Sequence, residues 1–173
     1  NKDDKEKYRK LSMDLSMLTL QFDQNALKDK NRFELQITDE NELSGLPESA
    51  RDAAAMLAKS KDKNGWLFNL SAPSYIPFMR YSDKRDLREK MYREYLSVGN
   101  KGDEFDNKDI IKKIVNIRLE IAQLMGFKNY AEYALEHTMA KNSANVYKLL
   151  NQLLEAYKPI AINEYNAVEG FAL

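Results

Sequence analysis

Cysteine is absent from this chain of 173 residues, which excludes disulfide bonds and thiolate metal sites. Histidine and tryptophan occur once each. Neither sign of charge predominates, because 27 Lys and Arg residues are matched by 27 Asp and Glu residues. A nucleic-acid-binding protein normally has a basic excess, and a membrane protein has long apolar runs that are missing here. We therefore expect neither nucleic acid nor membrane among the partners.

Both ends of the chain lack the marks of a natural terminus. The first ten residues, "NKDDKEKYRK", contain no initiator Met and no apolar signal-peptide core, and a helical pattern still continues at "VEGFAL". We interpret both ends as cut edges of a longer or processed polypeptide. Any leader would then be missing, so we expect a cytoplasmic location while a periplasmic one stays open.

Apolar residues recur at helical spacing through most of the chain. The predicted helices span 5–29, 48–60, 83–97 and 110–124, with a short helix after Asn129 and a last one capped by Asn142 or Ser143. Gly126 suits the position just after a helix end, and Asn129 with Glu132 resembles a capping box. Proline should interrupt the pattern, so we expect only a short irregular helical turn at 74–79 and a kink or break at Pro159.

The first predicted helix is apolar on two faces. One line comprises Tyr8, Leu11, Leu15, Leu18 and Phe22, and the second comprises Met13, Met17, Leu20 and Leu27. A helix of this kind usually lies between two layers. We expect one of those layers to come from residues outside this chain.

Two short segments have strand character. Phe33, Leu35 and Ile37 alternate with polar residues, and 66–70 forms the other candidate. The helix between them excludes a tight hairpin but allows a small ribbon. The predicted fold class is therefore mainly α, with six or seven helices and a small two-stranded β element.

The helix predicted at 83–97 is crowded with charges. Four pairs stand four residues apart: Asp86 with Lys90, Glu89 with Arg93, Arg85 with Glu89, and Lys90 with Glu94. Each such pair contributes a few tenths of a kcal/mol, on the order of 0.3. Leu87, Met91 and Tyr95 form the line that we expect to be buried.

No catalytic or metal-binding motif is present. His137 follows Glu136, and position 141 is Lys, so the H-E-x-x-H arrangement of a zinc site is missing and a surface histidine is the better interpretation. No G-x-S-x-G elbow and no phosphate-binding glycine motif occurs. The acidic stretches at 39–40 and 103–106 are typical of solvated charges or caps. From these residues alone we predict a non-catalytic, metal-free helical module.

An ordered set of residues nevertheless resembles a known family. The set comprises Pro73-Ser74-Tyr75, Pro77, Met79, Tyr81, Leu87-Arg88-Glu89, Tyr92, Tyr95, Asp106-Asn107, Arg118, Glu120, Ala122, Leu124, Gly126-Phe127 and Asn129-Tyr130-Ala131. These features are similar to the thimet oligopeptidase/oligopeptidase A family of zinc metallopeptidases, and within it most similar to bacterial peptidyl-dipeptidases (dipeptidyl carboxypeptidases). The resemblance covers about residues 8–165. One departure is "LSVGN" at Leu96–Asn100, where relatives often keep a basic residue.

The resemblance implies that residues 1–173 are a single helical segment of a larger, neurolysin-like helical peptidase. Such enzymes hydrolyse short peptides, and the peptidyl-dipeptidases release C-terminal dipeptides. Their zinc-binding catalytic part would lie beyond residue 173, so this segment would supply framework or channel wall and be inactive alone. Zinc is expected in the parent but not in this segment, and a monomer is expected.

No catalytic or metal residue transfers to this chain, and its substrate-binding residues stay unknown. The alternative is a free-standing helical binding or scaffold module that has no catalytic half.

Overall fold

A computed structural model describes residues 2–172, the side chain of Ala172 excepted, and divides the chain into two compact units. One unit comprises residues 16–114 and the other residues 1–15 with 115–173. The elements are α1 (Lys2–Arg32), β1 (Leu35–Ile37), η1 (Glu40–Leu43), α2 (Glu48–Ser60), β2 (Trp66–Phe68), α3 (Ala72–Tyr81), α4 (Arg85–Leu96), α5 (Lys108–Leu124), α6 (Tyr130–Leu135) and α7 (Ser143–Ala172). The prediction of a mainly α chain with a small two-stranded sheet is confirmed.

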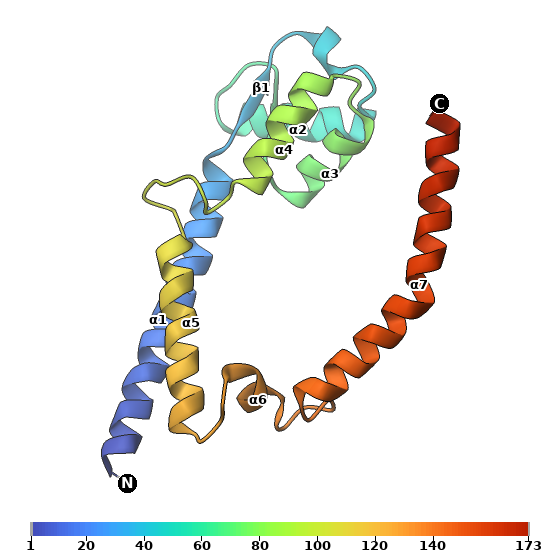
Figure 1. Ribbon diagram of the computed structural model, residues 1–173. Coiled ribbons are helices and arrows are strands. Elements are labelled where there is room, and N and C mark those ends of the chain that lie inside the picture. The colour runs from blue at the N-terminus through green and yellow to red at the C-terminus, as the bar shows by residue number, and fades with distance from the viewer. Residues whose placement is uncertain (1, 173) are drawn as a thin grey trace. The chain divides into compact units, whose positions relative to one another are not determined.

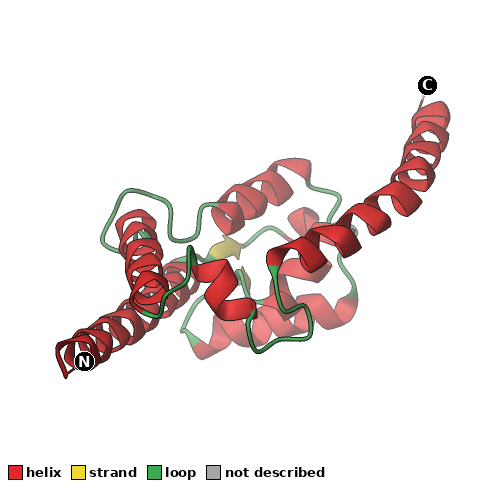
Figure 2. Ribbon diagram, turned by 60° about the horizontal axis from the view of Figure 1, so that its bottom comes forward, coloured by secondary structure: helices red, strands yellow, loops and turns green. Residues whose placement is uncertain are grey.

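The unit of residues 16–114 is built around the two strands. They pair antiparallel, with Leu35 opposite Phe68 and Ile37 opposite Trp66. The helix α2 lies between them in sequence and packs against β2, while α3 packs against both α2 and α4. Figure 1 shows α2, α3 and α4 gathered beside β1, and Figure 2 shows how short the strands are against the helices.

Side chains from all of these elements form one apolar core. Its buried members are Leu35, Ile37, Leu43, Leu46, Ala54, Phe68, Leu70, Phe78 and Met91. Phe68 and Phe78 meet edge to face, with ring centroids 4.8 Å apart. Fully burying a large apolar side chain contributes about 1.5–3 kcal/mol. This core, rather than the two short strands, therefore fixes α3 and α4.

The segment predicted as a short irregular helical turn at 74–79 is helical as predicted, but it is longer and forms the ten-residue helix α3. Pro73 stands in its first turn, where a missing N–H costs nothing. Pro77 lies inside the helix and removes one hydrogen bond. The complete burial of Phe78 offsets that loss, so the helix forms despite two prolines.

The two apolar faces of α1 have different environments. Leu11 is buried and Leu15, Leu18 and Phe22 are half-buried. On the second face Met13, Met17, Leu20 and Leu27 are 58–69 % exposed. Packing of α1 between two layers is therefore not observed among the described residues.

The second unit contains α6 and α7 with the start of α1 and most of α5. Gly126 follows α5 with a φ of +86°, and the Asn129 side chain accepts from the Glu132 N–H at 3.0 Å, as predicted. Asn142 rather than Ser143 caps α7, accepting from the Asn145 N–H at 3.0 Å. Within the described residues, no helix combines the length and the apolar character needed to cross a membrane.

The last helix is continuous through Pro159. Its ribbon changes direction partway along, in agreement with the predicted kink (Figure 1). Large apolar side chains are exposed along much of its length: Tyr147, Leu149, Leu150, Leu153, Leu154, Tyr157, Ile160, Ile162, Tyr165, Val168 and Phe171. An isolated helix with this pattern has apolar surface left to bury.

Candidate binding pocket at the start of α4

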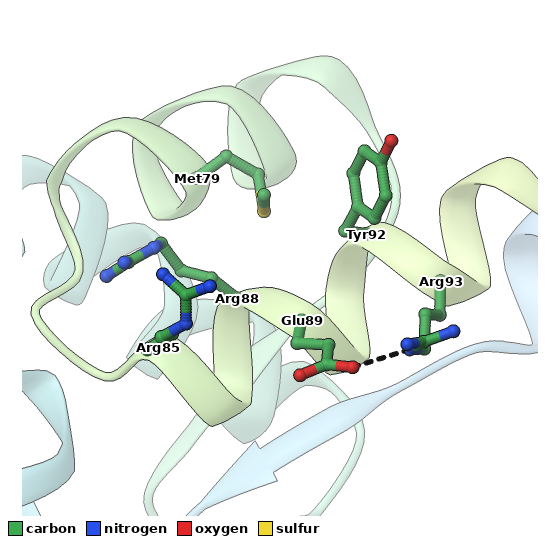
Figure 3. Close-up of a pocket in the computed structure, with 6 residues that line it drawn as sticks. All are labelled: Met79, Arg85, Arg88, Glu89, Tyr92 and Arg93. Carbon is green, nitrogen blue, oxygen red and sulfur yellow. Dashed lines mark hydrogen bonds and ion pairs between the residues drawn. The ribbon is translucent and has the colours of Figure 1, made fainter. Parts of the chain in front are cut away.

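A pocket of about 400 Å³ lies between α3 and α4. It is lined by Met79 from α3 and by Arg85, Arg88, Glu89, Tyr92 and Arg93 from α4, and we name these six residues the arginine pocket. Figure 3 shows their side chains projecting from the two helices. Met79 is half-buried and Tyr92 is 49 % exposed, so the pocket has an apolar wall beside its charges.

Local hydrogen bonds fix where α4 begins. Ser82 separates the two helices and is buried. Its hydroxyl oxygen accepts from the Lys84 N–H at 3.2 Å, and its carbonyl oxygen accepts from the Arg88 guanidinium. The Arg88 side chain is therefore anchored to a neutral backbone group rather than to a carboxylate.

The charges along α4 are arranged differently from the prediction. Of the four predicted pairs, the structure contains the pair of Glu89 with Arg93, at 2.7 Å from Oε1 to Nε. Glu94 instead contacts Lys101 at 2.6 Å. The Arg85 side chain makes no hydrogen bond or ion pair with any residue that the structure describes. The four-residue spacing permitted these pairs, but contacts outside the helix decided which of them form.

The prediction of a buried line along α4 is confirmed in part. Met91 is fully buried and Leu87 is half-buried, whereas Tyr95 is 42 % exposed. The Tyr95 ring stacks on Tyr75 of α3, with centroids 4.3 Å apart and planes 17° apart. Burial raises the pKa of the Tyr75 phenol, and the neighbouring Tyr95 adds to the effect. Tyr95 therefore contributes to the junction of α3 and α4 through one face of its ring.

The loop after α4 is held by a buried carboxylate on α1. Asp29 is completely buried, and its Oδ2 accepts from the Gly99 N–H at 2.7 Å. Its Oδ1 contacts Arg32 Nε at 2.7 Å and Lys101 Nζ at 3.3 Å. Sequence reasoning missed this role, because an Asp between two lysines on a charged helix gives no signal of burial.

The same loop is anchored again at its far end. Asn107 is buried; its side-chain NH₂ donates to the Phe22 carbonyl oxygen at 3.0 Å, and its side-chain oxygen accepts from Asn25 at 3.1 Å. Asp103 pairs with Arg32, which lowers the pKa of that carboxyl group. The segment 97–107, which includes the departure at Leu96–Asn100 except Leu96 itself, is therefore fixed to α1 at both ends.

The acidic stretches serve as local caps. Asp39 Oδ1 accepts from the Asn41 N–H at 2.9 Å at the start of η1. Asp106 accepts from the Lys108 N–H at 2.9 Å and from the Gly102 N–H at 2.6 Å, and these bonds help to lower the pKa of its carboxyl group. Their interpretation as caps is confirmed.

The single histidine lies in a turn after α6. The His137 side chain is 91 % exposed, and its Nε2 is 3.5 Å from Glu136. Over residues 2–172 no group of three His, Cys, Asp or Glu side chains lies close enough together to hold a metal ion. The residues described here thus do not fit a zinc site, and we derive no chemical step through zinc.

The fold is a mainly helical body with a small two-stranded sheet, and sequence comparison specifies the family to which the chain belongs. Residues 78–172 match the model of Peptidase family M3, and the chain belongs to that family. All of the arginine pocket lies within the matched region.

Within the family, the chain is more similar to oligopeptidase A than to dipeptidyl carboxypeptidase. The chain is 38 % identical over 170 residues to oligopeptidase A of Haemophilus influenzae, covering 96 % of this chain and 25 % of that protein. It is 38 % identical to the probable cytosolic oligopeptidase A of Arabidopsis thaliana, covering 98 % and 25 % of the two chains. For the dipeptidyl carboxypeptidase of Escherichia coli the identity is 29 %, with 96 % and 25 % covered.

The expected family is therefore confirmed. The peptidyl-dipeptidases are relatives, but their identities are lower than those of the oligopeptidase A proteins. The chain spans about a quarter of the length of these relatives.

Proposed function

We infer that this chain is part of a zinc-dependent peptidase that hydrolyses short peptides. The observation that carries this proposal is the 38 % identity to oligopeptidase A over 96 % of the chain. The names of the relatives describe peptidases of oligopeptides and of C-terminal dipeptides, and the family match covers the region from α3 to α7. Short peptides are accordingly the proposed substrates.

Residues 1–173 contribute the helical framework or a channel wall as a single segment of that peptidase, and they are inactive alone. The absence of a three-ligand group from residues 2–172 supports this division of roles. The exposed apolar side chains of α7 support it further, because they would pack against additional polypeptide. The zinc-binding catalytic part would then lie beyond residue 173.

Release of C-terminal dipeptides is the finer proposal, supported by the dipeptidyl carboxypeptidases among the relatives. Cleavage within oligopeptides is a second candidate, favoured by the higher identity with oligopeptidase A. Two peptides separate them. A quenched fluorescent pentapeptide with a free C-terminus is a substrate for either activity, whereas its C-terminal amide resists an enzyme that needs a terminal carboxylate.

The experiment compares this chain with the polypeptide that its gene encodes, each purified and supplied with zinc. We expect hydrolysis by the longer polypeptide, loss of that hydrolysis on chelation, and no hydrolysis by residues 1–173. Hydrogen exchange along α7 should slow in the longer polypeptide. The proposal fails if the gene encodes no H-E-x-x-H motif outside residues 1–173 and no peptide is cut. That outcome favours a free-standing helical binding or scaffold module.

The proposed peptidase acts as a monomer, and its expected location is the cytoplasm, with the periplasm left open. Nucleic acid and membranes are not proposed as partners. The molar mass by light scattering and the fractionation of the tagged protein test these points separately from its activity.

A further inference from the structure

We propose that the arginine pocket binds the carboxylate group of a short peptide. The choice of a peptide as the molecule that carries this carboxylate rests on the proposed function. The site itself is argued from the charges, contacts and shape of six residues on α3 and α4.

The pocket has positive charge without a partner. Three arginines and one glutamate line it, and the glutamate, Glu89, is bound by Arg93 at 2.7 Å. Arg88 donates to the neutral carbonyl oxygen of Ser82, and the Arg85 side chain makes no hydrogen bond or ion pair within residues 2–172. Figure 3 shows Glu89 directed toward Arg93. Arg85 and Arg88 therefore both line the pocket without a carboxylate bound to either side chain.

A carboxylate matches this arrangement better than a neutral group. The planar guanidinium presents parallel N–H donors that fit the two oxygens of a carboxylate. Arg85 and Arg88 also lie in the first turn of α4, where the helix dipole favours negative charge rather than two added positive charges. Asp86 is the one acidic residue of this turn, and an anion bound beside the two arginines would add negative charge at the end of the helix where the dipole favours it.

The rest of the pocket suits the body of a peptide. Met79 offers a flexible apolar surface on α3, and the half-exposed Tyr92 ring offers an apolar face with a hydroxyl group at its tip. A volume of about 400 Å³ accommodates one or two residues rather than a folded domain. The bound carboxylate is either the C-terminus of the peptide or the side chain of an Asp or Glu residue within it.

Binding can be measured by NMR titration of the ¹⁵N-labelled chain with three peptides. Acetyl-Ala-Ala-Ala has a terminal carboxylate, acetyl-Ala-Glu-Ala-amide has only a side-chain carboxylate, and acetyl-Ala-Ala-Ala-amide has neither. We expect saturable shifts of the amide signals at 79 and 85–93 with one or both of the first two peptides and none with the third. Which of the two binds identifies the source of the carboxylate.

Arg85→Gln is the decisive variant, because the Arg85 side chain makes no hydrogen bond or ion pair in the described residues whose loss would disturb the fold. We expect the affinity of this variant for the carboxylate peptide to fall about threefold or more, and that of the double variant Arg85→Gln/Arg88→Gln to fall about tenfold. These are the effects expected from the loss of one to two partly exposed ion pairs. The matched control is Arg80→Gln. Arg80 is an exposed arginine on α3 that lies over the Tyr81 ring outside the pocket, and its loss should leave affinity unchanged.

Three results overturn the proposal: no saturable shift, equal shifts with the carboxylate-free peptide, or equal losses for Arg80→Gln and Arg85→Gln. Tighter binding of inorganic phosphate than of either carboxylate peptide overturns it as well. The titration does not depend on hydrolysis. Hydrolysis by the longer polypeptide without binding here removes only the pocket proposal, whereas binding without hydrolysis removes only the proposed function.

Discussion

At the scale of single residues, Asp29 has the largest expected effect on stability. Its carboxylate is fully buried and reaches a backbone N–H and two cationic side chains at once. Asp29→Ala would leave the Gly99 N–H without its acceptor and would remove one of the two carboxylates that Arg32 and Lys101 each contact. We expect a loss of about 3 kcal/mol in the free energy of unfolding, measured by urea denaturation.

The control for Asp29 is Asp23, an exposed residue on the same helix. Asp23→Ala should change the free energy of unfolding by less than about 0.5 kcal/mol. Hydrogen exchange of the Gly99 amide should accelerate in the Asp29 variant alone. Equal losses in the two variants would show that Asp29 does not hold the loop.

A second residue, Glu34, makes stability depend on pH. Lys61 and Lys63 both pair with its carboxylate and lower its pKa from the ordinary value of 4.5. Because the folded pKa is the lower one, the stabilisation is present above about pH 4.5 and is lost as the pH falls through the folded pKa. Glu34→Gln should therefore cost about 0.5–1 kcal/mol at pH 7.

In acid the Glu34 carboxyl group is protonated and uncharged, like the glutamine side chain of the variant. The loss of unfolding free energy caused by Glu34→Gln should therefore disappear in acid. Urea denaturation at pH 7 and at successively lower pH values measures this change. Glu104→Gln, at an exposed position in the loop, is the control and should show no such dependence. A cost that stays constant as the pH falls would contradict the role of the two lysines.

At the scale of elements, the turn after η1 docks onto the linker between α3 and α4. The Ser44 carbonyl oxygen accepts from the Asp83 N–H at 2.9 Å, and the Ser44 hydroxyl donates to the Asp83 carboxylate at 2.6 Å. Gly45 has a φ of +82°, and a Cβ atom there would lie 2.1 Å from the Tyr81 carbonyl oxygen. The turn can approach the linker this closely only with glycine.

Gly45→Ala should therefore lower the free energy of unfolding by more than the cost of placing an alanine in a left-handed backbone conformation. Gly102→Ala is the control, because Gly102 also has a positive φ but has nothing within 4 Å of an added Cβ. We expect about 1–2 kcal/mol for Gly102→Ala and at least about 2 kcal/mol more for Gly45→Ala, measured as unfolding free energies. Equal costs would mean that the turn can move away from the linker.

The sequence predicts most elements because each depends on local patterns. Apolar spacing identified most of the helices, alternation identified the first strand, and Asn129 and Gly126 marked helix boundaries correctly. The length of α3 was underestimated, because two prolines argued against a helix that the burial of Phe78 stabilises. Of the predicted ion pairs of α4, Glu89 with Arg93 is confirmed, whereas Glu94 has its partner outside its own helix.

At the scale of the whole molecule, family membership was predictable and the candidate site was not. Many spaced residues in a fixed order indicate a family even when no catalytic residue is among them. The arginine pocket depends instead on which arginines are left without partners after folding, and spacing alone had assigned a partner to Arg85. The division into two compact units likewise reflects contacts between distant segments, which a local pattern does not encode.

The bond between Asp29 and Gly99 joins positions 70 residues apart. During synthesis on a ribosome, the carboxylate therefore emerges well before its backbone donor exists, and α1 must wait in water with that charge unburied. Elongation at about 5–20 residues per second makes the wait last several seconds. A nascent chain arrested before Gly99 would thus expose to solvent a carboxylate that the finished chain buries.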